Sequence, residues 1–414
     1  MGSRLAKVVP MRNFWSWRGL AVVAAGTAVG LAVPLAACAT GAAGAAGAAG
    51  AAGAAANARF QLPAVKHVWV IELENEGYAQ SFGNPAADPY LARTLPAKGA
   101  LLTSYYAIGH NSADNYIAQI SGQAPNILTQ EDCPVWVPTT EIIIGPYHQV
   151  LAPEGGCVFP RSVPTLGNQL SAAKLSWAAY LEDMGNNPAR DRTVATPRGP
   201  ACGHPATWGI DHTQSATTAD QYAARHEGFM YFRSVTGNAS YCAVHVLSFT
   251  PLRADLAAAD RTPAFSWISP NLCDDGHDMP CVTGQPGGLT RIDRFLASWI
   301  PVIMASPAYR DRGLILITFD EGNTDTACCG EQSGLSSSHP NTLSPGLGGP
   351  GGGDVGLVAL SPFIKPGTVS TVAYNHYSML RTIEDIFGLP HLGDAAMPQV
   401  KSFGADVFTR PQGG

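Results

Sequence analysis

Short apolar runs alternate with segments of helical periodicity along most of this chain. The apolar runs are rich in Val, Ile and Leu and are predicted to be strands. Near-continuous apolar strands separated by helices are typical of a mostly parallel central sheet with helices on both faces. We therefore predict an α/β fold, a single domain with long loop insertions. The predicted strands are 66–73, 101–108, 176–181, 265–269, 313–319 and 355–361; the predicted helices are 116–122, 165–174, 217–232, 289–305 and 378–387.

Polar residues come directly after several of these predicted strands. Glu74-Asn75 follows the first, His110-Asn111-Ser112 the second, and Asp320-Glu321 the strand 313–319. In open α/β sheets the site lies outside the carboxyl ends of the strands, so we expect these clusters to converge. The Gly-, Ser- and Pro-rich segment 322–354 is long enough to be a lid, with a plain surface loop as the alternative.

The N-terminal segment has the pattern of an export signal. Basic residues precede an apolar run, 20–37, that ends at Leu35-Ala36-Ala37-Cys38, a sequence that resembles a bacterial lipobox. A membrane anchor is the alternative, but the run barely reaches the roughly 20 residues that a span needs, and it contains Pro34. We predict an export signal at 1–38, with membrane attachment if Cys38 is lipidated. A Gly/Ala linker at 39–58 and one folded domain at 59–414 complete the chain.

Composition and charge narrow the function classes. The chain has 414 residues and a formal net charge of -6. The first 57 residues hold four basic residues and no acidic one, so the remaining 357 carry 21 basic and 31 acidic residues. An acidic body argues against nucleic acid as a partner, because that binding depends on Lys and Arg. A hydrophobic content of 46% excludes disorder of the whole chain.

The cysteines predict disulfides. Eight of the nine come after Cys38, and an even number in an exported protein indicates pairing. Cys273 and Cys281 are close enough for a local pair, whereas Cys328 and Cys329 form either a vicinal disulfide or two long-range links. Zinc bound by cysteines alone is disfavoured, since no CxxC pair is present.

The clusters contain residue types suited to phosphate chemistry. Ser112 lies where a helix begins, and helix N-termini attract anions, although Ser is also an ordinary N-cap. The oxygen ligands of Glu74-Asn75 and Asp320-Glu321 suit a divalent cation of unknown identity. Such a cation activates a bound oxygen, and an activated serine attacks phosphorus to form a phosphoserine.

Two histidines stand out from the others. His277 lies among Asp274, Asp275 and Asp278, and His376 opens the last predicted helix. Which of the three aspartates acts is open, although Asp275 fits best. We interpret four other histidines as ordinary core or surface residues: His67, His204, His226 and His245.

Five motifs in order, from about 67 to 389, resemble the phosphoesterase family of secreted acid phosphatases and phospholipases C in the alkaline phosphatase superfamily. The second resembles His-Pro-Ser-x-Pro-Asn-Tyr, but Asn111 and Asp114 replace both prolines. This change loosens the turn and adds a charge near the phosphate site. The motifs are HVWVIELEN (67–75), HNSADNY (110–116), Pro270-Asn271 with Asp275-Gly276-His277-Asp278, Thr318-Phe319-Asp320-Glu321, and Ser361-Pro362 with 376–385.

The resemblance implies that 59–414 is a phosphoesterase domain, an exported, metal-dependent hydrolase of phosphomonoesters, including phosphoinositides, with a serine nucleophile. A phospholipase C-type phosphodiesterase is one alternative, and a phosphate- or envelope-binding protein without turnover is another. Oligomeric state is open. The implied catalytic residues are Ser112, His110, His277 and His376; the substrate-binding residues are Asn75 and Asn115; the metal ligands are Glu74, Asn75, Ser112, Asp275, His277, Asp320 and Glu321.

Overall fold

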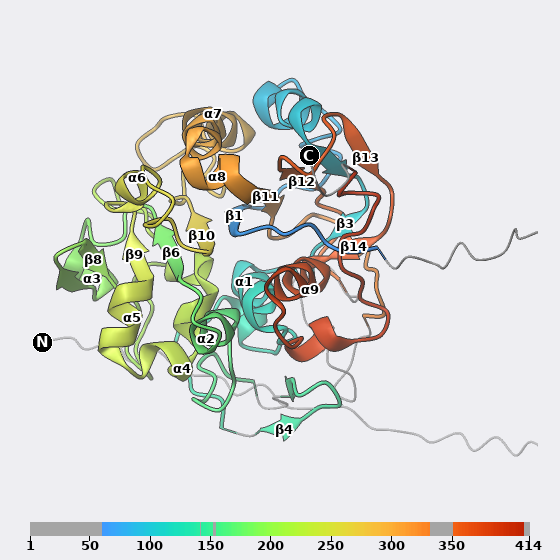
Figure 1. Cartoon of the computed structure of the whole chain (residues 1–414). Coiled ribbons are helices and arrows are strands. Elements are labelled where there is room, and N and C mark those ends of the chain that lie inside the picture. The colour runs from blue at the N-terminus through green and yellow to red at the C-terminus, as the bar shows by residue number, and fades with distance from the viewer. Residues whose placement is uncertain (1–59, 141, 152–154, 332–350, 410–414) are drawn as a thin grey trace, which may run out of the picture. The chain divides into compact units, whose positions relative to one another are not determined.

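A ten-stranded mixed sheet forms the centre of the protein in a computed structural model, shown in Figure 1. The structure describes residues 60–140, 142–151, 155–331 and 351–409, so the predicted export signal and the predicted linker lie outside the described residues. The strand order is β13-β2-β12-β11-β1-β10-β6-β9-β8-β7. Within the described residues, no helix has the length and apolar character that a membrane crossing requires.

Five neighbouring strands make up the parallel part of the sheet. β1 (His67–Leu73) lies between β10 (Phe265–Ser269) and β11 (Gly313–Phe319) and is parallel to both. β6 (Trp177–Leu181) and β9 (Val246–Ser248) continue the parallel order beyond β10. Their side chains are almost all buried, which explains why these strands are predominantly apolar in sequence.

Both edges of the sheet add shorter strands. β12 (Leu357–Leu360) runs antiparallel to β11 and to β2 (Ala100–Leu102), and β13 (Thr368–Ser370) closes that edge. β8 (Gly199–Ala201) and β7 (Val194–Thr196) form the other edge. Two separate strand pairs are β3 (Tyr105–Tyr106) with β14 (Tyr374–Asn375), and β4 (Ile143–Ile144) with β5 (Val150–Leu151).

Helices cover both faces of this sheet, which confirms the predicted fold class. In Figure 1, α7 (Leu289–Ala305) and α8 (Pro307–Arg312) lie above the strands. α1 (Ser112–Ser121), α2 (Leu166–Ala172) and α9 (His376–Phe387) lie below them. The remaining short helices are α3 (Pro188–Asp191), α4 (Arg233–Thr236), α5 (Ala239–His245) and α6 (Leu252–Asp255).

Two predicted elements were wrong. The strand predicted at 101–108 is split between β2 and β3, which belong to different sheets. The helix predicted at 217–232 is absent: the segment contains only the 3-10 turns Ala224–His226 and Gly228–Tyr231. Gly228 lies against α1, where a Cβ would be 2.3 Å from the carbonyl oxygen of Tyr116. The segment packs directly on α1, and this tertiary contact overrides its helical periodicity.

Four disulfides lie within the described residues, as an even number of cysteines predicted. Cys273–Cys281 is the expected local pair, and the vicinal alternative is the one observed for Cys328 and Cys329. The other two are Cys133–Cys157 and Cys202–Cys242.

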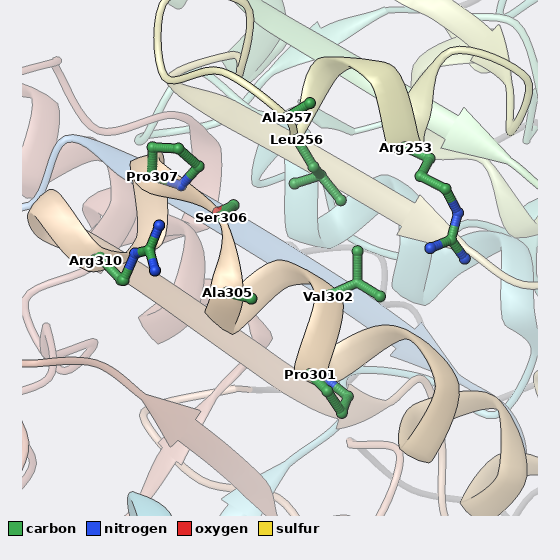
Figure 2. A pocket seen from close by; sticks show the side chains of 9 residues that line it. All are labelled: Arg253, Leu256, Ala257, Pro301, Val302, Ala305, Ser306, Pro307 and Arg310. Atoms are coloured by element: carbon green, nitrogen blue, oxygen red, sulfur yellow. The ribbon is translucent and has the colours of Figure 1, made fainter.

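A hollow of about 570 Å³ lies where α7 ends and α8 begins (Figure 2). It is lined by apolar side chains and by Arg253, Ser306 and Arg310, without a carboxylate. The helices that line the hollow come before β11 in the chain, whereas Asp320 comes directly after β11. None of the predicted site residues lines the hollow, so it is not the site that the sequence predicts.

Candidate active site

The polar residues after β1, β10 and β11 converge because these three strands are neighbours that run in the same direction. Glu74 and Asn75 follow β1, and Asp320 and Glu321 follow β11. The backbone N–H of Asn75 donates to Oδ1 of Asp320 at 3.0 Å, and that of Glu74 to the carbonyl of Asp275 at 2.9 Å. The carboxyl ends of three strands thus meet at one point.

Ser112 reaches this point from the first residue of α1. Its hydroxyl donates to Oε2 of Glu74 at 2.9 Å, and the side chain is 3% exposed. The phenol of Tyr116, one turn further along α1, donates to Oε1 of the same carboxylate at 2.7 Å. The amide of Asn75 donates to Oε2 at 3.1 Å. Glu74 therefore joins the helix start to the edge of the sheet.

Asn115 holds the turn that carries Ser112. Its Oδ1 accepts the backbone N–H groups of Ile108 and Gly109 at 2.9 and 3.0 Å. Its Nδ2 donates to the carbonyls of Gly109 and Asn111 at 3.0 and 2.9 Å. With all four bonds made to the turn, Asn115 supports the position of Ser112.

Asp114 is buried against Gly109 of this turn. A Cβ at residue 109 would lie 2.2 Å from Oδ2 of Asp114, so only Gly109 leaves room for the carboxyl. Burial raises the pKa of Asp114 well above its ordinary value, and the charges of Asp132 and Asp320 add to the shift. A raised pKa favours the neutral carboxyl group, so Asp114 places less negative charge near a phosphate than the sequence suggests.

The carboxyl groups of the site are crowded and buried. Burial raises the pKa of Glu74, with the charges of Asp320 and Asp275 adding to it. Burial also raises the pKa of Asp320 to about 6, against hydrogen bonds that include the N–H of Asn75. The pKa of Glu321 rises well above its usual value through burial and the neighbouring Asp320. Such a set is suited to a cation, because a nearby positive charge offsets the cost of ionising buried and crowded carboxyl groups.

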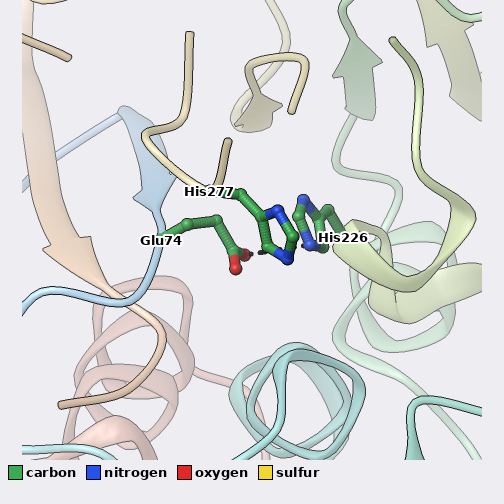
Figure 3. Close-up of side chains that lie close together, drawn as sticks. All are labelled: Glu74, His226 and His277. Atoms are coloured by element: carbon green, nitrogen blue, oxygen red, sulfur yellow. Dashed lines mark ion pairs between the residues drawn. The ribbon is translucent and has the colours of Figure 1, made fainter. Parts of the chain in front are cut away.

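Two histidines face Glu74, as Figure 3 shows. His226 donates from Nδ1 to Oδ2 of Asp275 at 2.8 Å, and its Nε2 lies 3.4 Å from Oε1 of Glu74. Ligand atoms of Glu74, His226 and His277 all lie within 4.8 Å of one another. Burial lowers the pKa of His226 well below its ordinary value, which keeps the ring neutral and able to bind a metal.

His277 has partners at both ring nitrogens. Arg225 donates to its Nε2 at 2.9 Å, and Nδ1 lies 2.9 Å from the carboxylate of Asp278. Of the three aspartates in this motif, Asp275 lies closest to the site: it also accepts the backbone N–H of His277 at 2.8 Å. Asp274 forms an ion pair with Arg291.

His376 and His110 flank the site. Nε2 of His376 lies 2.8 Å from the backbone carbonyl of Asp320, and Nδ1 lies 3.1 Å from the hydroxyl of Tyr105. Burial lowers the pKa of His376 to about 4, so the neutral ring holds the backbone of Asp320. His110 is half-buried beside Gly322 and Asp325, and its burial lowers its pKa.

Two buried residues of the site, His226 and Arg225, are missed by the sequence analysis, which interprets His226 as an ordinary core or surface histidine. The signal available was a basic pair inside an apolar stretch, 222–232. The other three histidines given that interpretation do have structural partners: His67 contacts the carbonyl of Pro263, His204 that of Pro205, and His245 that of Trp177.

The donor set fits a divalent cation. Oδ2 of Asp320 and Oε2 of Glu321 are buried without a hydrogen-bond donor, as is Nε2 of His226. Oxygen and imidazole donors are the ligands that such ions take in proteins. A cation would satisfy these atoms and offset the repulsion among the carboxylates.

The fold and site define a class: an α/β protein with a helix-N-terminal serine and a carboxylate cluster at the carboxyl edge of its parallel strands. The model of the Phosphoesterase family matches residues 84–390. The chain belongs to this family, which confirms the resemblance seen in its five motifs.

Relatives with known names include an acid phosphatase from Aspergillus fumigatus, 25% identical over 326 residues, which cover 79% of this chain and 55% of that protein. A probable acid phosphatase from Kluyveromyces lactis is 25% identical, covering 80% and 60%. A phosphatidylinositol-3-phosphatase from Mycobacterium tuberculosis is 24% identical, covering 81% of each chain. This chain therefore matches only a little over half the length of the two fungal relatives.

Similar solved structures are more distant. A phosphonate monoester hydrolase from Silicibacter pomeroyi gives a TM-score of 0.44 at 11% identity, covering 84% of this chain and 77% of that one. A protein of the alkaline phosphatase superfamily from Vibrio parahaemolyticus gives 0.40 at 12% identity, covering 82% and 71%.

Proposed function

We propose that this chain is an exported, metal-dependent phosphomonoesterase whose nucleophile is Ser112. The observation that carries the proposal is the hydrogen bond from Ser112 to Glu74, made at a helix N-terminus beside Asp320 and Glu321. The names of the phosphatase relatives support a phosphate monoester as substrate, with phosphoinositides among the candidates. The N-terminal sequence pattern and the four disulfides support export.

The residues that would hold the cation offer oxygen atoms at the ends of β1 and β11 and at the start of α1. We assign this role to Glu74, Asn75, Ser112, Asp320 and Glu321, with His226 facing Glu74. When bound, a divalent cation neutralises phosphate charge and lowers the pKa of the serine hydroxyl. Asp275 orients His226, and His376 orients Asp320, so both act as positioning residues in this proposal.

The chain's own groups then account for the proton and bond changes. The oxygen of Ser112 bonds to phosphorus while the bond from phosphorus to the alcohol oxygen breaks, and the serine proton passes to Glu74. The leaving alkoxide takes a proton from a water molecule, because both ring nitrogens of His277 already have partners in Arg225 and Asp278. The hydroxide left by that water attacks the phosphoserine and releases phosphate, while Glu74 returns its proton to the serine oxygen and restores the hydroxyl.

Hydrolysis of p-nitrophenyl phosphate by residues 59–414 tests this proposal, with and without chelator, in the wild type and in Ser112→Ala. Ser121→Ala is the matched control, because Ser121 lies in the same helix and donates only to the carbonyl of Ile117. We expect Ser112→Ala to lower kcat by at least about 10³-fold with an unchanged unfolding temperature. Ser121→Ala should stay within a few-fold of wild type.

The outcomes separate the mechanisms. Acid quenching of the wild type during turnover should trap a phosphoserine at residue 112. Chelator-sensitive activity that survives in Ser112→Ala would contradict the serine nucleophile. Turnover of bis(p-nitrophenyl) phosphate without turnover of the monoester would favour a phosphodiesterase instead.

A further inference from the structure

A buried arginine lies inside the acidic site. Arg225 is 2% exposed, and its guanidinium donates to Nε2 of His277 and to the carbonyl of Gln214, both at 2.9 Å. Its Nε lies 3.9 Å from Oδ2 of Asp132. A guanidinium is the side chain best shaped to bind two oxygens of one phosphoryl group.

The charge of Arg225 acts on four carboxyl groups in and beside the site. It lowers the pKa of Glu74, Asp275, Glu321 and Asp132 against the effect of burial. These carboxylates come from four separate segments of the chain. Among the described residues, no other Lys or Arg forms an ion pair with any of them. Arg225 is therefore the cationic side chain of this cluster.

Asp132 connects this arginine to the start of α1. Its Oδ1 accepts the backbone N–H of Ala113, the residue after Ser112, at 2.9 Å, while its Oδ2 faces Arg225. One carboxylate thus contacts both a helix N-terminal N–H and a guanidinium. These are the donors that a phosphoryl group on Ser112 would need for its non-bridging oxygens.

We propose that Arg225 and the N–H of Ala113 bind the non-bridging oxygens of the substrate phosphoryl group, and that Asp132 competes for both donors. The inference rests on the proposed function and adds a reason for substrate choice. A monoester carries up to two negative charges on its phosphoryl oxygens, whereas a diester carries one. A buried guanidinium therefore favours the monoester, and the competing carboxylate weakens the binding of inorganic phosphate.

Two assays on residues 59–414 test this inference. The first compares kcat/KM for p-nitrophenyl phosphate and for bis(p-nitrophenyl) phosphate in the wild type, Arg225→Lys and Arg225→Gln. We expect Arg225→Gln to lower the monoester value by about 10²-fold and the diester value by less than about tenfold, with Arg225→Lys between it and wild type. The second measures inorganic phosphate binding by calorimetry. Arg225→Gln should weaken it, and Asp132→Asn should tighten it by roughly tenfold.

Arg190→Gln is the matched control, because Arg190 is also a nearly buried arginine but pairs with Asp191 and Asp220 instead of a carboxylate of the site. It also holds the same segment through the carbonyls of Ser215 and Tyr222, so it reports any effect of disturbing that segment alone. It should leave the ratio of monoester to diester activity unchanged. The inference would be overturned if Arg225→Gln lowered kcat/KM equally for both esters. It would also be overturned if phosphate affinity were the same in the wild type, Arg225→Gln and Asp132→Asn. A wild type that hydrolyses neither ester would instead contradict the proposed function, and the phosphate measurement would still decide the role of Arg225.

Discussion

Replacing Asn115 by alanine separates two roles for this residue. The family resemblance predicts that it binds substrate, whereas the structure shows its amide bonded four times to the turn at 108–111. In Asn115→Ala, two N–H groups and two carbonyls lose their partners in a buried turn. At about 1 kcal/mol for each bond, the free energy of unfolding should fall by about 4 kcal/mol.

The same change should slow the reaction. Ser112 comes directly after this turn, and displacement of a nucleophile by about 1 Å costs on the order of 10²-fold in rate. We therefore expect kcat to fall by about 10²-fold with little change in KM. Urea unfolding of residues 59–414 gives the stability, and p-nitrophenyl phosphate turnover gives kcat and KM.

Two further variants sharpen the result. Asn115→Asp keeps acceptors for Ile108 and Gly109 but turns a carboxylate oxygen toward the carbonyls, so it should also lose stability. Asn168→Ala removes the capping box of α2, away from the site, and should cost about 1 kcal/mol with kcat unchanged. A rise in KM for Asn115→Ala with no loss of stability would refute the reasoning and restore the substrate-binding role.

Three other properties of the protein can be tested in the same way. Dialysis against chelator should lower both activity and unfolding temperature, and a divalent cation should restore both; an unfolding temperature that ignores the chelator would argue against a bound cation. Burial, with the neighbouring charge of Asp293, raises the pKa of Asp88 to about 7 from an ordinary 3.8, so folding becomes less favourable as pH rises between these values. Asp88→Asn should then raise the unfolding temperature by about 1–3 °C at pH 8, a gain that shrinks toward pH 4, and an equal gain at both would contradict this. Replacing Cys133 and Cys157 by serine opens a link with a sequence separation of 24, so the free energy of unfolding should fall by about 3.5 kcal/mol in urea titrations; an unchanged midpoint would show that the link adds no stability.

Several site residues were predictable because they come directly after strands whose apolar sequences are easy to recognise. Apolar strands such as 313–319 are readable from composition, and the residues that come directly after a parallel strand lie at the carboxyl edge of the sheet. Glu74 and Asp320 could therefore be placed together from sequence, whereas Asp275 was indicated by the family motif. Asp275 could also be preferred over Asp274 and Asp278, in agreement with its bond to His226.

Other parts of the site depend on contacts between distant segments. The stretch 217–232 has a helical pattern, yet its packing against α1 reduces it to short 3-10 turns that carry Arg225 and His226 inward. The spacing of hydrophobic residues along the sequence carries no information about such a contact between distant segments. The roles of Asn115 and His376 were hidden for the same reason, since their partners are backbone groups of turns that exist only in the folded chain.

The sequence by itself determined the α/β class, the family and the acidic residues that end the central strands, because hydrophobic period and motif order are local properties. The tertiary structure decided which side chains complete the cluster. It set His226 against Glu74, Arg225 against His277, and Asp132 at the start of α1. Burial is the physical reason: hydrogen bonds and charges count strongly where water is excluded, and only the packed fold decides where that is.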